Sequence, residues 1–446
     1  MVVNGLFFSF FVYSFILFKK GSSEIFFWFI FYLNFFLLWS LKLLLETSEC
    51  VFTNHYSSML VLDKVSCVFL VLTIWVMVVG VCSMLYVDSR VGDLVVGLVI
   101  LHSLLVFFFF SCNLLNFFLF FELSVVPLFW IISYWGSQKE RFFSNYYFIL
   151  YTVVSSSPFL LIVLSSMLSG VVSGVLIFFS SKFFVTGACF LGLMVGFYSK
   201  LPLFGFHIWL PKAHVDAPVG GSMLLAGILL KLGSLGAIRV LSLLGFGGFF
   251  VIKLSLVLAS WGFFVASVMC LRLTDLKVII AFSSVSHMSL ALGGLVVLSG
   301  WGLKGGFLVF LGHGIISPAL FYLGNMIYSR GGSRTLSGMK SLGIMNKFYL
   351  FVLVFFLFNV GLPPFVNFFG ELGIFFSMFF YAKFLVGVVF LGFFFSGLYM
   401  IMLVVSLVGS KTWFRLVDKF FFLEWVLLVY MFFSYVWLSL GTELWF

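Results

Sequence analysis

The sequence predicts an all-α polytopic membrane protein with about fourteen transmembrane helices. Of its 446 residues, 63% are hydrophobic and only 9% are charged. Apolar runs of about 20 residues, the length that a helix needs to cross a bilayer, follow one another along the chain between short polar breaks. No stretch has the composition of a water-soluble domain, and no cleaved signal peptide is expected. The expected helices lie near 3–18, 24–43, 64–87, 93–110, 114–134, 145–169, 183–210, 218–240, 250–270, 276–298, 304–326, 346–380, 384–408 and 421–442.

The charges between the helices support this number of spans. Loops on the cytoplasmic or matrix side of a membrane carry the excess of Lys and Arg. Fifteen of the 24 basic residues fall in the odd-numbered loops and seven in the even-numbered ones, which fits fourteen spans with both chain ends on the outer face. The formal net charge of +10 arises from residues that are scattered singly. The charge therefore indicates membrane topology, and no nucleic-acid partner is expected.

Two of the helices are expected to be broken within the membrane. The seventh contains LPLF at 201–204 and the twelfth contains LPPF at 362–365, and a proline ends or kinks a helix. The twelfth run would be ~50 Å long as one straight helix, against a hydrocarbon core of ~30 Å. The breaks are assigned to Pro202, Pro363 and Pro364.

Matching breaks in two halves of a chain indicate inverted repeats with a polar site between them. We expect an N-terminal three-helix segment (1–90), a first five-helix repeat of helices 4–8 (91–243), a second of helices 9–13 (249–408) and a C-terminal helix (409–446). A chance coincidence of two short Leu-Pro motifs is the alternative explanation.

Four ionisable residues lie where the chain is most apolar. Lys200 and Lys231 fall in the seventh and eighth helices, and Glu122 and Glu371 are the two acids clearly inside apolar spans. A charged side chain at bilayer depth costs roughly 2.5–3.5 kcal/mol on insertion scales, so such residues usually carry function. Glu122 and Lys200 lie in helices that can be neighbours, where an ion pair makes the protonation of each depend on the other. A static pair that only locks helix packing is the alternative.

Lys231 and two histidines are candidates for a proton path that ends at Glu371. Lys231 has no acidic partner in its own helix, and burial disfavours its ammonium form, so it can load and release a proton; snorkelling to an interface is the alternative. His287 follows Ser283 and Ser284 by one turn, and His313 precedes Ser317 by one turn, so imidazole and hydroxyl groups could order water between Lys231 and Glu371. Hydrogen-bonded core histidines are the other interpretation.

The remaining histidines are weaker candidates. His102 has no polar neighbours in its span and is interpreted as structural, and His207 falls in the predicted seventh helix. His214 and Asp216 lie with Lys212 in the expected short loop PKAHVDAP on the basic side. That loop offers a proton-uptake point or a subunit contact, with an ordinary solvated turn as the alternative.

No motif for a cofactor or a metal is present. The sequence has no GxGxxG, no P-loop and no defensible pair of haem-ligating histidines. Its six cysteines form neither a CxxC pair nor a Cys/His pattern, so they are interpreted as small apolar residues without disulfides or iron–sulfur ligation. We expect a chain that moves charge without itself carrying electrons.

Several of these stretches together resemble a known family. They are FFELSVVPLFWIISYWGSQKER at 120–141, the stretch 198–239, CLRLTDLKVIIAFSSVSHMSLA at 270–291, GHGIISPALF at 312–321 and LPPFVNFFGEL at 362–372. The chain is similar here to the antiporter-like proton-translocating subunits of respiratory NADH:ubiquinone oxidoreductase, known as complex I. The resemblance runs from about Leu114 to Leu372, while the first 90 and last 40 residues match only in hydropathy.

The resemblance implies roles for the buried ionisable residues. The family pairs a glutamate on helix 5 with a lysine on broken helix 7, which fall on Glu122 and Lys200, and its central helix-8 lysine falls on Lys231. Its bridging histidines fall on His287 and His313. Sibling subunits carry lysine on helix 12, whereas one member carries glutamate, as here at Glu371. The family's usual AHVEAP loop has become AHVDAP, which keeps a carboxylate at Asp216.

The resemblance also implies a function and a setting. It implies a non-redox subunit of NADH:ubiquinone reductase that translocates protons in the mitochondrial inner membrane. Such a chain binds no cofactor itself, since NADH, FMN, iron–sulfur clusters and ubiquinone belong to partner subunits. Its neighbours would be other membrane-arm subunits, especially antiporter-like chains 2 and 5, and membrane lipids. A stand-alone or Mrp-type sodium/proton antiporter, or a structural or quinone-associated arm subunit, are the alternatives.

Overall fold

A computed structural model describes residues 22–46, 54–55, 61–85, 90–168, 187–244, 249–339, 346–408 and 422–441. The expected first helix near 3–18 lies outside these residues. The elements of the N-terminal part are α2 (Ser22–Glu46), β1 (Asn54–His55), β2 (Val61–Leu62), α3 (Lys64–Ser83), α4 (Val91–Phe110), α5 (Leu114–Leu123), α6 (Val125–Trp135), α7 (Arg141–Leu168), α9 (Gly187–Lys200), α10 (Trp209–Asp216), α11 (Val219–Leu224), the π-helix η1 (Leu225–Leu229) and α12 (Leu230–Leu244).

The C-terminal part contains further helices and no described strand. They are α13 (Phe249–Arg272), α14 (Leu276–Val296), α15 (Gly300–Gly331), α16 (Leu336–Met339), α17 (Asn346–Val360), α18 (Val366–Tyr381), α19 (Lys383–Val408) and α20 (Phe422–Leu440). The strands β1 and β2 form a short antiparallel pair between α2 and α3, which the sequence analysis did not anticipate. The fold class, an all-α polytopic membrane protein, is confirmed.

The described helices account for most of the expected spans. Ten are long and apolar enough to cross a membrane, with α5 and α6 forming one span and α11 to α12 another. Shorter apolar helices supply three more spans. These are α2, the broken seventh helix that contains α9, and the broken twelfth helix that contains α17 and α18. The helix bounds agree with the expected ranges to within about five residues, except around the seventh helix, where α9 ends at Lys200 and α10 runs to Asp216.

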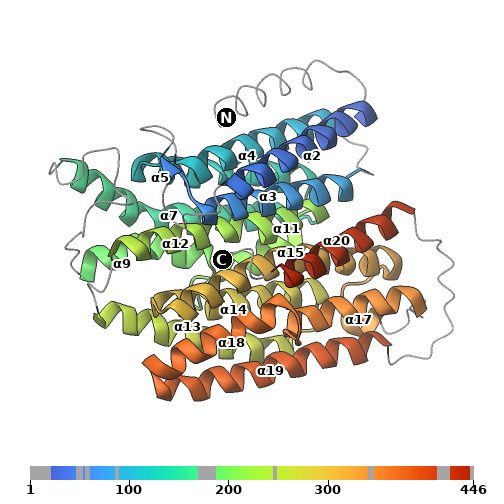
Figure 1. The fold of residues 1–446 in the computed structure, drawn as a ribbon. Coiled ribbons are helices and arrows are strands. Elements are labelled where there is room, and N and C mark those ends of the chain that lie inside the picture. The colour runs from blue at the N-terminus through green and yellow to red at the C-terminus, as the bar shows by residue number, and fades with distance from the viewer. Residues whose placement is uncertain are drawn as a thin grey trace.

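The helices lie side by side in one bundle (Figure 1). α2, α3 and α4 occupy one side, α17, α18 and α19 the opposite side, and α11, α12, α14 and α15 run between them. The apolar windows of the α11–α12 span and of α15 are completely buried, whereas only 28% of the α20 window is buried. The interior of the bundle is therefore formed by the spans that carry Lys231 and His313.

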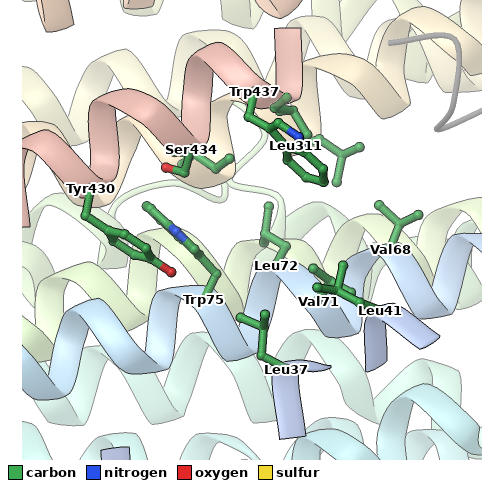
Figure 2. Close-up of a pocket in the computed structure, with 12 residues that line it drawn as sticks. Leu37, Leu41, Val68, Val71, Leu72, Trp75, Leu311, Tyr430, Ser434 and Trp437 are labelled. Atoms are coloured by element: carbon green, nitrogen blue, oxygen red, sulfur yellow. The ribbon is translucent and has the colours of Figure 1, made fainter. Parts of the chain in front are cut away.

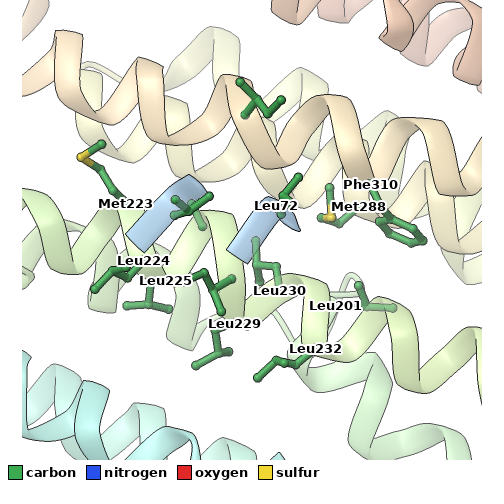
Figure 3. Close-up of a cluster of buried hydrophobic side chains, with 14 of the residues drawn as sticks. Leu72, Leu201, Met223, Leu224, Leu225, Leu229, Leu230, Leu232, Met288 and Phe310 are labelled. Atoms are coloured by element: carbon green, nitrogen blue, oxygen red, sulfur yellow. The ribbon is translucent and has the colours of Figure 1, made fainter. Parts of the chain in front are cut away.

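Leucine and methionine side chains surround η1 in this interior. Figure 3 shows the leucines of α11, η1 and α12 next to Leu72 of α3, Met288 of α14 and Phe310 of α15. Each of these side chains is at most 5% exposed. Because close-packed apolar side chains exclude water, any polar group placed here depends on protein partners or on individual buried waters.

The expected breaks in the seventh and twelfth helices are confirmed. α9 ends at Lys200, and the chain runs irregularly through Pro202 before α10 begins at Trp209. α17 ends at Val360, and α18 begins at Val366 after the Gly-Leu-Pro-Pro-Phe segment, in which the peptide bond between Pro363 and Pro364 is cis. Whether the two halves are inverted repeats stays a prediction.

A buried ion pair joins the N-terminal helices to α12. Arg239 donates from Nη2 to Asp63 Oδ2 at 3.1 Å and to the Phe109 carbonyl oxygen at 3.0 Å, and from Nη1 to the Ser111 carbonyl oxygen at 3.2 Å. Asp63 directly precedes α3, and both side chains of the pair are at least nine-tenths buried. The sequence analysis selected neither residue as a candidate, because the two partners are distant in the sequence.

Candidate functional site

The first group of buried ionisable residues lies at the break of the seventh helix. The Lys200 ammonium group is fully buried, donates to the Phe121 carbonyl oxygen at 2.7 Å and lies 3.0 Å from the centre of the Phe121 ring. Glu122 Oε1 lies 3.4 Å from it, with the Glu122 side chain 20% exposed. As the last residue of α9, Lys200 also meets the negative end of the helix dipole. A carboxylate, a carbonyl, an aromatic ring and a helix end thus stabilise this cation together.

Three residues hold the break in a fixed geometry. The Trp209 indole at the start of α10 donates to the Ser199 carbonyl oxygen at 2.9 Å, so this bond spans the irregular segment. The Ser199 hydroxyl also lies 2.5 Å from the hydroxyl of Ser155 on α7. Because Trp209 and Ser199 are fully buried, these bonds determine where α9 ends and where Lys200 points.

Lys231 sits directly after η1 and uses the irregularity of this π-helix. A π-helix pairs residues i and i+5 and widens the turn. The Lys231 ammonium group reaches back to the Ala226 carbonyl oxygen at 2.8 Å and lies 3.1 Å from Nδ1 of His313. Lys231 is fully buried, and both of these contacts are to uncharged acceptors. It therefore does not snorkel, and within the described segments no carboxylate forms an ion pair with it as Glu122 does with Lys200.

The structure brings four of the candidate residues into one line across four helices. From Lys231 on α12, the line continues through His313 on α15 to His287 on α14, whose ring centres are 5.9 Å apart. Nδ1 of His287 lies 3.3 Å from Oε1 of Glu371 on α18. The exposed fractions of the four residues are between 0% and 7%. We call the line formed by Lys231, His313, His287 and Glu371 the relay.

The break of the twelfth helix places the end of the relay. Gly361 has φ +74°, a left-handed conformation that glycine adopts without strain. A Cβ atom at this position would lie 2.8 Å from Oε2 of Glu371. The missing side chain of Gly361 therefore makes the space in which the Glu371 carboxyl group faces His287.

The two lysine sites lie on helices that pack directly together. A Cβ atom added to Gly233 on α12 would lie 3.2 Å from Cβ of Lys200 and 3.1 Å from Cγ of Leu201. Gly233 comes two residues after Lys231, so the backbones that carry both lysines are in close approach. Like charges in such a poorly solvated interior interact much more strongly than in water.

His214 occupies a different environment from the one that the sequence analysis predicted. The expected loop PKAHVDAP is largely helical, since α10 runs to Asp216. The expected seventh helix ended at 210, but Pro211 lies in the first turn of α10, where proline is tolerated. His214 is fully buried and stacks on Phe321, with ring centres 4.5 Å apart and planes 7° apart. A solvated turn at His214 is therefore excluded.

The surroundings of His214 connect the relay with one end of the bundle. Lys231 and Lys277 are both electrostatic neighbours of His214. Asp216 follows at the end of α10, where burial raises the pKa of its carboxyl group. Polar groups thus extend from the buried Lys231 to the partly exposed end of α10.

His207 and His102 lie outside the relay. His207 belongs to the irregular segment after Lys200 and not to a helix as predicted, because Pro202 and Gly205 interrupt the seventh helix there. Its Nδ1 accepts from the Gly205 amide at 3.3 Å, and its ring stacks on Phe204. His102 is 1% exposed and packs edge-on against the rings of Tyr32 and Phe36.

A cavity of about 190 Å³ lies elsewhere, between α2, α3, α15 and α20. Figure 2 shows its lining side chains, which are almost entirely apolar; they include Leu37, Val71, Leu72, Trp75, Leu311 and Tyr430. Leu311 lies two residues before His313 and Ile315 two residues after it. Two positions correspond to roughly half a helical turn, so both side chains lie on the face of α15 opposite to His313. The cavity and the relay are therefore separate features.

The described residues offer no site for a metal ion, since no three His, Cys, Asp or Glu side chains among them are grouped suitably. No disulfide joins the described cysteines Cys67, Cys82, Cys112, Cys189 and Cys270 to one another, and Cys50 lies outside the described residues.

The fold and the site together define a class of protein: a multi-pass membrane protein whose broken helices and π-helix hold a buried line of lysine, histidine and glutamate. A family model described as "NADH:quinone oxidoreductase/Mrp antiporter, TM" matches residues 111–398. NADH-ubiquinone oxidoreductase chain 4 of Paracentrotus lividus is 34% identical over 385 residues, which cover 82% of each chain. This chain belongs to that antiporter-like family and, within it, to the chain 4 subunits of NADH-ubiquinone oxidoreductase.

Solved structures share the fold. A chain of the respiratory complex I from Thermus thermophilus with bound NADH matches with a TM-score of 0.86 and 23% identity, covering 99% of this chain and 96% of that one. A chain of the membrane-bound sulfane sulfur reductase, an archaeal respiratory membrane complex, matches with a TM-score of 0.85 and 17% identity, covering 100% and 94%. The bundle is thus an architecture that respiratory membrane complexes with different chemistry have in common.

Proposed function

We propose that this chain is a proton-translocating subunit of the membrane arm of respiratory NADH:ubiquinone oxidoreductase and couples that reaction to proton pumping. The family membership supports the assembly, and the relay supports the proton role. The single observation that carries the proton role is the continuity of the relay: a lysine, two imidazoles and a carboxyl group lie in sequence in an otherwise apolar interior.

The chemistry of the relay follows from its contacts. The Lys231 ammonium group points a proton at Nδ1 of His313, 3.1 Å away. The 5.9 Å between ring centres lets the proton pass from His313 to His287 through one water or a ring rotation. His287 then faces the Glu371 carboxylate at 3.3 Å. Since each imidazole can hold a proton on one nitrogen and release one from the other, the line can conduct without moving any helix.

The pair of Glu122 and Lys200 is suited to control Lys231. Lys200 keeps its bonds to the Phe121 carbonyl and ring whether or not Glu122 is charged. Neutralising or moving Glu122 therefore leaves a less compensated cation on the helix that packs against Gly233. This raises the electrostatic energy of a proton on Lys231 and drives it toward His313.

His214 and Asp216 supply the proton in this proposal. Asp216 lies at the partly exposed end of α10, and the buried His214 ring has Lys231 as an electrostatic neighbour. Protons taken up at Asp216 would reach Lys231 by way of His214 after each transfer.

The energy has to come from outside this chain. Moving one charge against the membrane potential costs roughly 2.3 kcal/mol per 100 mV. We propose that NADH, FMN, iron–sulfur clusters and ubiquinone act in partner subunits, and that this chain is non-redox. The neighbours would be the antiporter-like chains 2 and 5. The animal relatives support a place in the mitochondrial inner membrane.

Substitution of Lys231 tests the function. In sealed vesicles that contain the intact complex, Lys231→Ala should assemble and oxidise NADH while the number of protons pumped per NADH falls. Native gel separation with in-gel NADH dehydrogenase staining establishes that the variant chain is in the complex. An unchanged proton yield would contradict the role of Lys231. Finding the wild-type chain only in a small complex with sodium flux would favour the Mrp-type antiporter instead.

A further inference from the structure

A buried carboxamide that the relay does not include lies in the break of the twelfth helix. Asn367, the second residue of α18, is 0% exposed. Its Nδ2 donates to the Phe358 carbonyl oxygen at 3.4 Å, and the same oxygen accepts from the Gly361 amide at 3.3 Å. Asn367 is therefore bonded to the turn in which Gly361 makes the space for the Glu371 carboxyl group.

The oxygen end of this carboxamide faces α15. Asn367 Oδ1 occupies the place that a Cβ atom on Gly312 would take, so it contacts the backbone of α15 at the residue before His313. Within the described part of the chain, this oxygen accepts no conventional hydrogen bond. Gly312 offers it a contact with a Cα–H group, of the kind that recurs between packed helices. Asn367 thus joins the start of α18 to the residue beside His313.

The rest of the interface between α15 and α18 contains close contacts of backbone atoms. A Cβ atom added to Gly305 would lie 2.7 Å from the Gly370 carbonyl oxygen, and one added to Gly370 would lie 2.9 Å from the Gly305 carbonyl oxygen. Glycines let the two backbones approach this closely. Gly312 comes two turns after Gly305, and there the Asn367 side chain lies between the helices. The Asn367 carboxamide is therefore the spacer at the end of the interface next to the relay.

We propose that Asn367 is a positioning residue of the relay. Its carboxamide fastens the start of α18 to the broken segment and to α15, and so sets where the Glu371 carboxyl group lies relative to His287 and His313. Glu371 follows Asn367 by four residues, so both side chains lie on the same face of α18. This inference rests on the proposed function, because it concerns the proton that passes from His313 through His287 to Glu371.

Asn145 on α7 provides a matched control. It is also 0% exposed, its Nδ2 donates to the Phe129 carbonyl oxygen on α6 at 3.3 Å, and its Oδ1 has no hydrogen-bond partner among the described residues. Replacing either asparagine with alanine removes the same atoms from the same kind of environment. Asn367→Ala and Asn145→Ala should therefore lower the melting temperature of the purified complex by similar amounts.

The two alanine variants should differ in proton pumping. The pumping rate per assembled complex is measured in sealed vesicles, next to wild type and Lys231→Ala, and NADH oxidation is measured in uncoupled vesicles. Asn367→Ala should pump about 10-fold more slowly, because a displacement of the carboxyl group by about half an ångström has an effect on this order. Asn145→Ala should pump like wild type, and both variants should retain NADH oxidation.

A double variant tests the spacing directly. Gly312→Ala places a methyl group where Asn367 Oδ1 lies and should slow pumping by itself. In combination with Asn367→Ala, the same methyl group fills the space that the carboxamide has left, so the double variant should pump faster than either single variant. Such a recovery measures the coupling between two residues in contact, whereas unrelated packing defects would add.

The outcomes separate this inference from the proposed function. If Lys231→Ala stops pumping while Asn367→Ala pumps like wild type or like Asn145→Ala, the role of Asn367 is wrong and the relay stands. If Lys231→Ala pumps normally, the relay itself is wrong. A double variant that pumps no faster than the single variants contradicts the spacing role of the carboxamide. Should Asn367→Ala fail to assemble, Gly312→Ala decides, because it disturbs the same contact from the other helix and has to slow pumping about 10-fold.

Discussion

Replacing Gly361 with alanine should disconnect Glu371 from His287 without unfolding the chain. At φ +74° an alanine is strained by roughly 1–2 kcal/mol. Its Cβ atom would lie 2.8 Å from Oε2 of Glu371, whereas ordinary contact begins at 3.4 Å. The Glu371 side chain is the flexible partner, so the carboxyl group has to move.

The size of this movement determines the expected effect. The His287 to Glu371 distance of 3.3 Å is already longer than the 2.7–2.9 Å typical of charge-assisted hydrogen bonds. A further displacement of about half an ångström takes it beyond hydrogen-bond reach. A misplacement of about 1 Å can reduce a reaction rate by ~100-fold, and half of this displacement accordingly by ~10-fold. We expect the proton-pumping rate to fall about 10- to 100-fold, with NADH oxidation retained in uncoupled vesicles.

Gly332 provides the matched control. It also has a positive φ, +64°, but a Cβ atom added there would meet nothing within 4 Å. Gly332→Ala should therefore show a comparable loss of thermal stability and normal pumping. If both alanine variants pump alike, the argument that Gly361 makes space for Glu371 is refuted.

Three further substitutions follow from the described contacts. Arg239→Met should destabilise the chain by about 3–5 kcal/mol, because it removes one partner of a buried ion pair, and a melting temperature of the purified complex within error of wild type would contradict this. Glu122→Gln keeps the shape but removes the charge beside Lys200, so pumping should slow while assembly on a native gel stays normal; an unchanged pumping rate would argue for a purely structural pair. Trp209→Phe removes the indole bond across the helix break and should lower pumping by several-fold with little loss of stability; equal losses of both would indicate general packing damage.

Local chemistry allowed much of the fold to be predicted. The breaks at Pro202 and Pro363 were predictable because proline acts on its own turn and the residue before it. Span lengths were predictable because the bilayer fixes them. By contrast, η1 was missed, since its i to i+5 pairing has no residue signature in Leu225–Leu229. The helical turns of α10 were missed, because a proline such as Pro211 is tolerated in the first turn of a helix and gives no sign that a helix continues past it.

Most residues of the candidate site could be predicted from the sequence, but fewer of the contacts between them could. Buried charges stand out in apolar runs, so Lys200, Lys231 and Glu371 could be selected from the sequence. Asp63 and Arg239 could not, because each lies near a span end and they are 176 positions apart. The burial of His214 could not be predicted either. It depends on the packing of α10 against Phe321, which is distant in the sequence and leaves no local sequence pattern.

The π-helix has a consequence for how this sequence can change. It accommodates one more residue in its turn than an α-helix would, so everything after Leu229 is rotated relative to a regular helix by roughly 100°, one residue's share of a turn. A regular α-helix over the same residues would therefore turn Lys231 away from His313 by that angle. Deleting one residue between Leu225 and Leu229 together with the π-turn would leave the orientation of Lys231 unchanged, because the two rotations cancel. The direction in which Lys231 points thus depends on the wide turn and its extra residue together.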